Sequence, residues 1–372
     1  MTNRQRFRAI LNYETYDRMP VVHFGFWSET LWKWAQEGHI TEEEARTWED
    51  GNATDKAISA KLGFDMNYYS VVHLATNIRP PFESRVLRTR PDGSREVLNE
   101  DGVIILQKDG AGSIPMEVDH LLKSRKEWEE EYLPRMQFSE DRAYISDELK
   151  AYLEDENRSD WVGLQCGSLY GSIRNWIGVE GTAYLYADDP ILFKEMIDTM
   201  GDLCYRCVET ALNQTTAFDF AHFWEDICFK SGPLISPRVF EELVGPHYKR
   251  ITDLTRSKGI NICSVDCDGK IDALIPTWLS NGVNTMFPIE VGTWNASIAP
   301  WRDQYGRELR GVGGMNKVVF ARDYAAIDAE IERLKPLVEL GGYIPCPDHR
   351  IPPDAKWENV QYYCEKFRKA FG

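Results

Sequence analysis

The sequence lacks several features that would assign it to a protein class at once. It contains no apolar run of transmembrane length, and residues 1–20 contain no apolar stretch of the kind found in secretion signals. It has no GxGxxG motif and no P-loop, which argues against nicotinamide and ATP as cofactors. We therefore expect a cytoplasmic protein that acts without a bound nucleotide.

Cysteine and positive charge are also scarce. Eight cysteines in 372 residues are too few for a disulfide scaffold, so reduced thiols are expected. The chain has 43 Lys and Arg against 59 Asp and Glu, a net charge of -16. Because an acidic surface repels polyanions, we expect neither nucleic acid nor an anionic membrane as a partner.

Short runs rich in valine, isoleucine, tyrosine and phenylalanine recur along the chain, and helix-like segments separate most of them. Eight strands that alternate with helices predict an α/β fold, specifically a (β/α)8 TIM barrel formed by one domain of residues 1–372. An open, doubly wound sheet is the alternative. The predicted strands cover residues 20–27, 66–73, 161–168, 217–224, 259–266, 283–290, 309–316 and 342–349.

One region interrupts this alternation. Residues 83–108 contain two turn sequences, PDGS and NEDG, between strand-like runs, which predicts an antiparallel β-meander. Residues 110–160 are charged and helix-prone. We interpret residues 80–160, approximately, as an insertion after the second barrel strand.

Polar residues gather where the predicted strands end. In a TIM barrel the working residues lie at the carboxyl ends of the strands. Asp266 and Asp268 share one face of the fifth strand because side chains alternate. Two carboxylates this close require a cation, a proton or solvent between them, although DCDG is also a common turn sequence. The candidates are His23 and Trp27, His222 and Glu225, Asp266 and Asp268, Asn316, and Cys346 and His349.

Five segments, taken together, give the chain a resemblance to a known family. It resembles the uroporphyrinogen decarboxylase superfamily through most of its length, and that resemblance implies a (β/α)8 barrel. The segments are GSLYGSIRNWIGVEG (167–181), WEDICFKSGPLISPRVFEELVGPHYKRI (224–251), DCDGKIDALIPTWLSNGVNTMFPIE (266–290), GVGGMNK (311–317) and GGYIPCPDHRIPPD (341–354).

The superfamily has two branches, and residues 21–34 favour one of them. Decarboxylases carry an arginine-rich signature there, whereas this segment has no arginine and is rich in Trp and Phe. The other branch comprises corrinoid-dependent methyltransferases, many of which bind zinc through an H-x-C pair and a later cysteine. The matching positions here are Asp266, Asp268 and His349, so each ligand type has changed while each residue can still bind metal.

These replacements imply a change in chemistry. Carboxylate and imidazole are harder ligands than thiolate and suit a metal that acts as a Lewis acid on an oxygen. The resemblance therefore implies transfer of a methyl group from a methyl ether, such as a methoxylated phenol, to a corrinoid. We find no D-x-H-x-x-G corrinoid motif, so a partner protein would carry it. Asp266, Asp268, His349 and Cys346 are the expected zinc ligands; Cys346 is an alternative to one carboxylate.

The remaining candidates receive roles by the same reasoning. Glu225, with Asp266 and Asp268, is expected to be catalytic, and Glu225 could also complete the metal shell. His23, Trp27, His222 and Asn316 are expected to contact the substrate. Two alternatives stay open: a metal-independent, uroporphyrinogen decarboxylase-like enzyme acting on a tetrapyrrole, and a member that only binds corrinoid or a partner.

Overall fold

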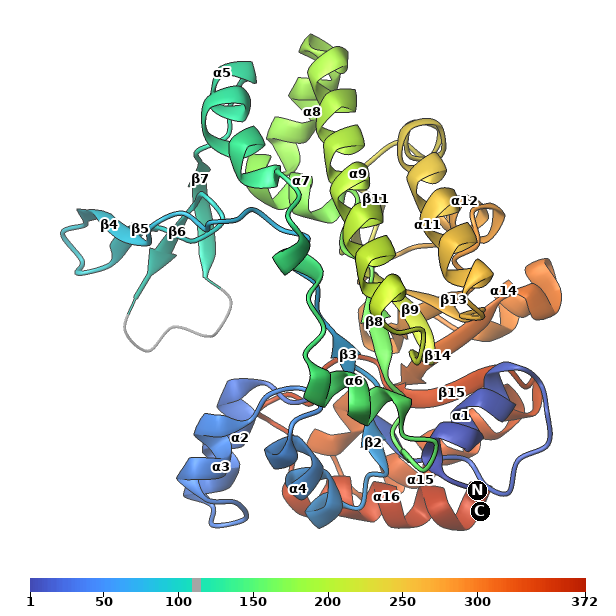
Figure 1. Cartoon of the computed structure of the whole chain (residues 1–372). Coiled ribbons are helices and arrows are strands. Elements are labelled where there is room, and N and C mark those ends of the chain that lie inside the picture. The colour runs from blue at the N-terminus through green and yellow to red at the C-terminus, as the bar shows by residue number, and fades with distance from the viewer. Residues whose placement is uncertain (109–114) are drawn as a thin grey trace.

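Parallel strands form the centre of the structure, a computed structural model that describes residues 1–108 and 115–372. Seven of them form one sheet in the order β15-β14-β13-β12-β9-β8-β3 (Figure 1). All neighbours in this sheet run parallel. Their bounds are β3 (Val71–Val72), β8 (Gly163–Gln165), β9 (Phe220–Trp224), β12 (Cys263–Asp266), β13 (Thr285–Ile289), β14 (Arg310–Met315) and β15 (Tyr343–Pro347).

A second, two-stranded parallel sheet contains β1 (Val22–His23) and β2 (Met66–Asn67). Backbone hydrogen bonds connect the segment after β1 with the segment after β15. The Trp27 N–H donates to the Ile351 carbonyl at 3.2 Å, and the Ile351 N–H donates to the Gly25 carbonyl at 3.0 Å. The strands therefore have a TIM-barrel-like arrangement in which β1 and β15 are neighbours.

Helices lie outside the strands, with α9 and α11 on one side and α15 and α16 on another (Figure 1). The helical segments that separate the strands include α9 at residues 190–214 and α15 at residues 324–339. The helices are α1 (Asn3–Leu11), α2 (Ser28–Gln36), α3 (Glu42–Thr47), α4 (Ala53–Leu62), α5 (Arg125–Glu127), α6 (Asp147–Glu154), α7 (Gly171–Ile177), α8 (Val179–Asp188), α9 (Pro190–Gln214), α10 (Pro237–Val239), α11 (Gly245–Ser257), α12 (Ile275–Ser280), α13 (Val291–Trp294), α14 (Ile298–Tyr305), α15 (Tyr324–Glu339) and α16 (Trp357–Phe371).

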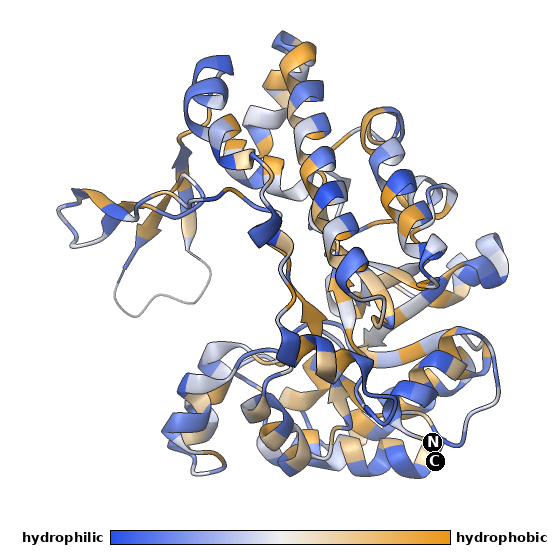
Figure 2. Ribbon diagram, in the orientation of Figure 1, coloured by the Kyte–Doolittle hydropathy of each residue, from blue (hydrophilic) through white to orange (hydrophobic). Residues whose placement is uncertain are grey.

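Two large apolar clusters hold the layers together. One packs outward-facing strand residues such as Val265 against α9 and α11; the other joins inward-facing residues such as Phe287 with α1 and α16. Figure 2 shows the same pattern, with hydrophobic residues concentrated on strands and on the helix faces toward them. Each fully buried large side chain contributes about 1.5–3 kcal/mol, so these clusters dominate the stability.

The second predicted strand differs from the structure. Residues 66–73 form two short strands in different sheets, β2 and β3, rather than one. The chain turns between them because the Asn67 side chain accepts a hydrogen bond from the Tyr69 N–H at 2.9 Å and Ser70 Oγ donates to the Asn67 carbonyl at 2.9 Å. The alternation of apolar residues gave no indication of this local side-chain turn.

After β3 the chain forms a four-stranded antiparallel sheet in the order β4-β5-β6-β7. Figure 1 shows it standing away from the central strands. Its hydrophobic cluster is small and contains Val97, Val103 and Ile105. The strands are β4 (Arg85–Thr89), β5 (Arg95–Leu98), β6 (Val103–Gln107) and β7 (Met116–His120). The prediction for residues 110–114 lies outside the described residues.

Candidate functional site

Two of the predicted site residues, Asp268 and His349, meet at the carboxyl ends of the strands. Asp268 lies two residues beyond the end of β12, and His349 lies two residues beyond the end of β15. Asp268 Oδ2 is 3.3 Å from His349 Nε2, and the two side chains are 33% and 20% exposed. The structure therefore pairs a carboxylate and an imidazole that are 81 residues apart in the sequence.

The backbone fixes the protonation pattern of His349. Its Nδ1 accepts a hydrogen bond from the Arg350 N–H at 2.8 Å. A neutral imidazole carries one hydrogen, so that hydrogen lies on Nε2 and faces Asp268. Trp27 stacks on the imidazole with ring centroids 5.3 Å apart and an interplanar angle of 17°, and the Phe24 ring approaches at 5.7 Å. These aromatic rings limit rotation of His349.

Asp266 is buried beside this pair. Among the described residues its carboxylate has no hydrogen-bond or ion-pair partner, and one oxygen of Asp268, Oδ1, is also unpaired. Burial is the main reason that the pKa of Asp266 is raised well above its usual value, and the nearby carboxylates Asp268 and Asp226 raise it further. Asp266 is therefore the most strongly perturbed acid of the group.

Two more acids complete the cluster, and the predicted site omitted both. Asp226 follows β9 in a left-handed conformation, with φ of 48°. Burial raises the pKa of Asp226 and of Glu290, and Asp268 raises both further. Glu290 Oε2 also accepts the Gly269 N–H at 2.5 Å. Both residues sit at strand ends, which is the sequence signal that could have found them.

Glu225 is a predicted catalytic residue, but its surroundings indicate a structural role. It is fully buried, and its carboxylate accepts the N–H groups of Leu169, Tyr170 and Gly171 at 2.8–3.0 Å. The Tyr248 hydroxyl donates to it at 2.5 Å. Burial raises the pKa of Glu225 and these hydrogen bonds oppose that rise. With its oxygens occupied, Glu225 anchors the start of α7 to the end of β9.

Cys346, a predicted metal ligand, is not brought to Asp268 and His349. It is fully buried in the inward-facing apolar cluster, and burial raises the pKa of its thiol well above the usual value. A thiol in such surroundings resists the deprotonation that metal binding requires. Cys346 lies within β15, three residues before His349, whereas the acids lie at or beyond the ends of their strands.

Two predicted substrate contacts, His23 and Asn316, are occupied within the fold. His23 Nε2 lies 2.7 Å from Ser59 Oγ, and its Nδ1 accepts the Gly25 N–H at 2.9 Å. Asn316 accepts the Val318 N–H at 3.1 Å and so caps the short helix that follows β14. Neither side chain contacts the acidic cluster through a hydrogen bond among the described residues.

Asp348 is likewise part of the framework, although it adjoins His349. Its Oδ2 accepts the Gly292 N–H at 2.7 Å, and its Oδ1 accepts the Lys317 N–H at 3.1 Å. These bonds tie the end of β15 to the segments that follow β13 and β14. Asp348 thereby holds the backbone that carries His349.

Few of these side chains are placed so that they could bind one metal ion together. In residues 1–108 and 115–372, no three or more His, Cys, Asp or Glu side chains are grouped so that they could hold an ion. Asp268, with one unpaired oxygen, and His349 are suitable donors for a divalent cation, with Asp266 adjacent. Two side chains are therefore placed to bind a divalent cation, and a third would have to move toward them.

Part of the chain is similar to a known protein family. Residues 177–370 match the family described as uroporphyrinogen decarboxylase (URO-D). The chain belongs to the uroporphyrinogen decarboxylase family. The matched residues include Glu225, Asp266, Asp268 and His349, so the paired side chains lie within the family's part of the chain.

Solved structures add information on the fold of this family member. A methyltransferase from Methanosarcina mazei has a TM-score of 0.58 and 15% identity, covering 99% of this chain and 98% of the other. A putative vitamin-B12 independent methionine synthase from Listeria monocytogenes has a TM-score of 0.36 and 13% identity, covering 62% and 71%. The first shows a shared fold. A search of curated proteins found no match.

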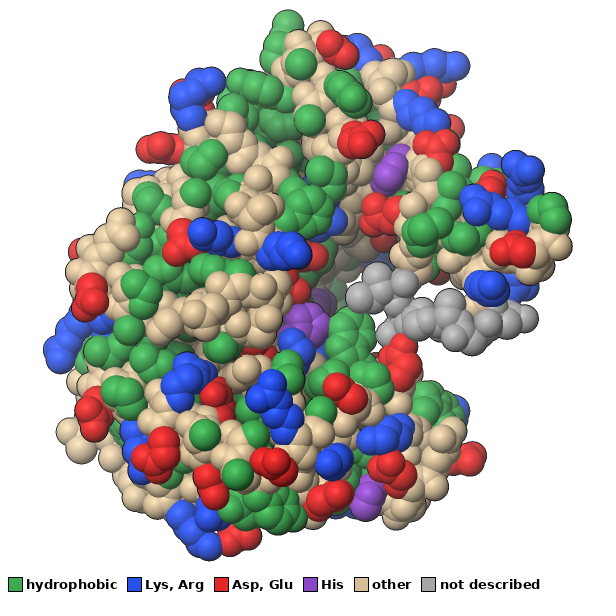
Figure 3. Space-filling view, turned by 180° about the vertical axis from the view of Figure 1, so that it is seen from behind, with side chains coloured by type: hydrophobic (Ala, Val, Ile, Leu, Met, Phe, Trp, Pro, Cys, Tyr) green, Lys and Arg blue, Asp and Glu red, His purple; other side chains and the backbone are tan. Residues whose placement is uncertain are grey.

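The face in Figure 3 is hollowed near its centre, where histidine and hydrophobic side chains lie.

Within the described residues, none of the helices has the length and apolar character that crossing a bilayer requires.

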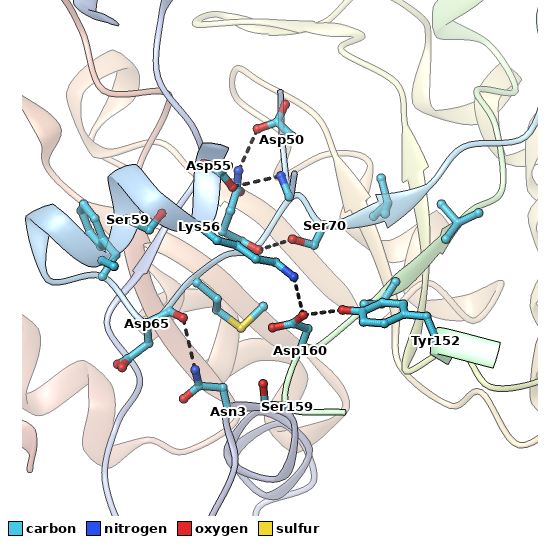
Figure 4. Close-up of a pocket in the computed structure, with 18 residues that line it drawn as sticks. Asn3, Asp50, Asp55, Lys56, Ser59, Asp65, Ser70, Tyr152, Ser159 and Asp160 are labelled. Carbon is cyan, nitrogen blue, oxygen red and sulfur yellow. Dashed lines mark hydrogen bonds and ion pairs between the residues drawn. The ribbon is translucent and has the colours of Figure 1, made fainter. Parts of the chain in front are cut away.

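A separate cavity of about 330 Å³ lies between α4, β2, β3 and the segment before β8. Figure 4 shows its polar side chains turned toward one another. Lys56 pairs with Asp160 at 2.7 Å, and the Tyr152 hydroxyl donates to the same carboxylate. Because these groups satisfy each other, and because the cavity lies outside the matched family region, it is a weaker candidate than the strand ends.

Proposed function

We propose that this member of the uroporphyrinogen decarboxylase family is a corrinoid-dependent methyltransferase. It would move a methyl group from a methyl ether, such as a methoxylated phenol, to a corrinoid on a partner protein. Family membership and the shared fold with a methyltransferase support the general class. The pairing of Asp268 with His349 beside Asp266, against Trp27 and Phe24, carries the specific proposal.

The protein side chains can manage the proton in this reaction. When the methyl–oxygen bond breaks, the departing oxygen takes a negative charge and needs a proton. Without a metal, His349 holds a hydrogen on Nε2, the nitrogen that faces the cluster, and Asp268 orients it, so the imidazole can supply that proton. A zinc ion bound to Nε2 would replace this hydrogen; His349 would then be a ligand, and the proton would come from water. Trp27 and Phe24 offer an apolar surface for an aromatic methyl donor.

Zinc is the proposed metal: Asp268 and His349 would hold it, and the adjacent Asp266 would have to move toward them to serve as a third ligand. When bound, zinc would supply positive charge at the substrate oxygen and the corrinoid would accept the methyl group. Cys346 is excluded from this ligand set because it lies in the apolar core.

A metal analysis combined with a transfer assay tests this function. We expect about one zinc per chain, lost in Asp268→Asn and in His349→Gln. A screen of methoxylated phenols with cob(I)alamin, or with a corrinoid protein from the same source, should detect methylcobalamin. His39→Gln is a matched control, because His39 stacks on Trp357 outside the cluster. Absence of transfer with every donor would contradict the proposal.

A tetrapyrrole decarboxylase is the second candidate, and the family match favours it. The acidic cluster opposes it, because Asp226, Asp266, Asp268 and Glu290 would repel a substrate with many carboxylates. Metal-independent decarboxylation of uroporphyrinogen by the purified protein would establish this alternative and remove the first.

A further inference from the structure

A layer of polar side chains lies inside the sheet, directly below the acidic cluster. The strand register aligns Gln165 with His222, His222 with Ser264, and Ser264 with Thr285. Neighbours in register point to the same face. This layer lies two residues below Asp266, and branched apolar residues usually fill such layers in a TIM barrel. Its polarity therefore calls for a physical explanation.

Most polar atoms of this layer have partners, but two buried atoms do not. His222 Nδ1 lies 2.7 Å from Ser264 Oγ, and Gln165 Oε1 lies 3.1 Å from His73 Nδ1. His222 Nε2 has no hydrogen-bond partner among the described residues. The hydroxyl of Tyr68, in the turn between β2 and β3, lies near Ser264 but has no partner at full hydrogen-bonding geometry among the described residues; these side chains are 1% and 0% exposed. Buried polar atoms are nearly always satisfied, so an unpaired couple indicates a ligand position.

The two unpaired atoms offer complementary hydrogen bonding. Ser264 Oγ lies 3.5 Å from the Ala221 carbonyl oxygen, to which its hydroxyl can donate. His222 then donates from Nδ1 to Ser264, which leaves Nε2 as an acceptor. Burial lowers the pKa of His222 to about 3, so the ring is neutral at pH 7. Tyr68 supplies an O–H donor. A hydroxyl group can use both.

Aromatic rings connect this layer with His349. The Phe24 ring lies 5.7 Å from His349 and 4.6 Å from Phe287, and the Phe287 ring lies 6.1 Å from His222. Tyr69 meets His222 edge-on at 5.3 Å and is only partly buried, so it stands between His222 and the surface. These rings are in contact with one another, so an aromatic molecule would have to reach His222 by displacing Tyr69.

We propose that His222 and Tyr68 bind the free hydroxyl of an aromatic methyl donor, so that the substrate is a methoxyphenol and not a simple aryl methyl ether. This inference rests on the proposed function. Two layers two residues apart along a strand are separated by about 6.6 Å, which favours hydroxyl and methoxy groups on opposite sides of the ring. The hydroxyl lies in the deep layer, and the methoxy group lies beside Asp268 and His349.

Calorimetric titration with 4-methoxyphenol and with methoxybenzene tests the subsite directly. The wild-type protein should bind 4-methoxyphenol at least about ten times more tightly, because a site built for a hydroxyl rejects the analogue without one. Tyr68→Phe removes only the hydroxyl and should reduce this ratio to about three or less. His222→Phe should do the same. In both variants the affinity for methoxybenzene should stay unchanged.

Tyr363→Phe is the matched control. The Tyr363 hydroxyl is also buried and unpaired, but it lies on α16 in the helical layer. This variant should keep the wild-type ratio, and thermal melting of all variants checks that they fold. Equal wild-type binding of the two compounds, no binding of either, or an unchanged ratio in Tyr68→Phe would overturn the subsite. A structure with only an ordered water between the two atoms would do so as well.

The same experiment separates the subsite from the proposed function. Preference for 4-methoxyphenol without methyl transfer from any donor would leave the subsite standing and reject the methyltransferase. Methyl transfer from methoxybenzene as rapid as from 4-methoxyphenol would support the methyltransferase and reject the subsite.

Discussion

Two pairs of carboxylates near the strand ends look alike in sequence but differ in their surroundings. Glu225 and Asp348 receive hydrogen bonds from backbone N–H groups of neighbouring segments. Asp266 and Asp268 receive none among the described residues, and Asp268 faces His349. Acids whose oxygens are occupied by the backbone hold the framework, whereas acids left unpaired are available for chemistry.

The largest stability effect is expected at Glu225. Glu225→Ala would leave three buried N–H groups and the Tyr248 hydroxyl without their acceptor. The free energy of unfolding should fall by about 4 kcal/mol, measured by urea denaturation. Glu225→Gln retains one acceptor oxygen and should lose roughly half as much. A loss below about 1 kcal/mol in Glu225→Ala would place Glu225 outside the framework group.

Asp268 should show the opposite behaviour. Asp268→Asn should lower methyl transfer by at least about 100-fold, because both the bound zinc and the orientation of His349 are lost, while stability changes by less than about 1 kcal/mol. Activity is measured as the rate of methylcobalamin formation, and stability as the urea midpoint. Loss of folding in Asp268→Asn would contradict the division.

Acid sensitivity should depend on His222. Its pKa is about 3 in the folded protein against an ordinary 6.5, so the unfolded chain binds the extra proton between these values. This contribution to stability is complete above pH 6.5 and declines as pH falls toward 3. Between pH 7 and pH 5 it should cost about 2 kcal/mol. His222→Phe should remove that part of the decline; an identical decline in both proteins would contradict it.

The smallest effect is expected at Cys346. Cys346→Ala removes one buried sulfur from the apolar cluster and should cost about 1 kcal/mol of stability. Zinc content and methyl transfer should equal those of the wild type within error. If elemental analysis shows that zinc is lost in this variant, Cys346 is a ligand and the ligand set proposed here is wrong.

The sequence predicted strands better than it predicted the use of their side chains. The ranges predicted for β12, β14 and β15 contain the observed strands, because buried runs between glycines are distinctive. Asp268 and His349 are both predicted as ligands because they follow strand ends, and the structure places them 3.3 Å apart. The turn at Asn67 that separates β2 from β3 was missed, since one side-chain hydrogen bond controls it.

The role of Glu225 could not be inferred from the sequence. The N–H groups that bind it belong to residues 169–171, more than 50 positions away, and only the folded chain brings them together. Cys346 was misplaced for a different reason. It lies within β15, whereas His349 lies two residues beyond the end of that strand, and the sequence did not show where the strand ends.

The hydrogen bond from Arg350 to His349 has a consequence for protein engineering. Every amino acid except proline offers the same main-chain N–H at position 350, so the tautomer of His349 does not depend on which residue occupies that position. Exchanging the guanidinium would break its ion pair with Asp50 at 2.6 Å, but it would leave the hydrogen bond to His349 Nδ1 in place. Arg350→Pro is the one replacement that removes this hydrogen bond, and in that variant either ring nitrogen of His349 could carry the hydrogen.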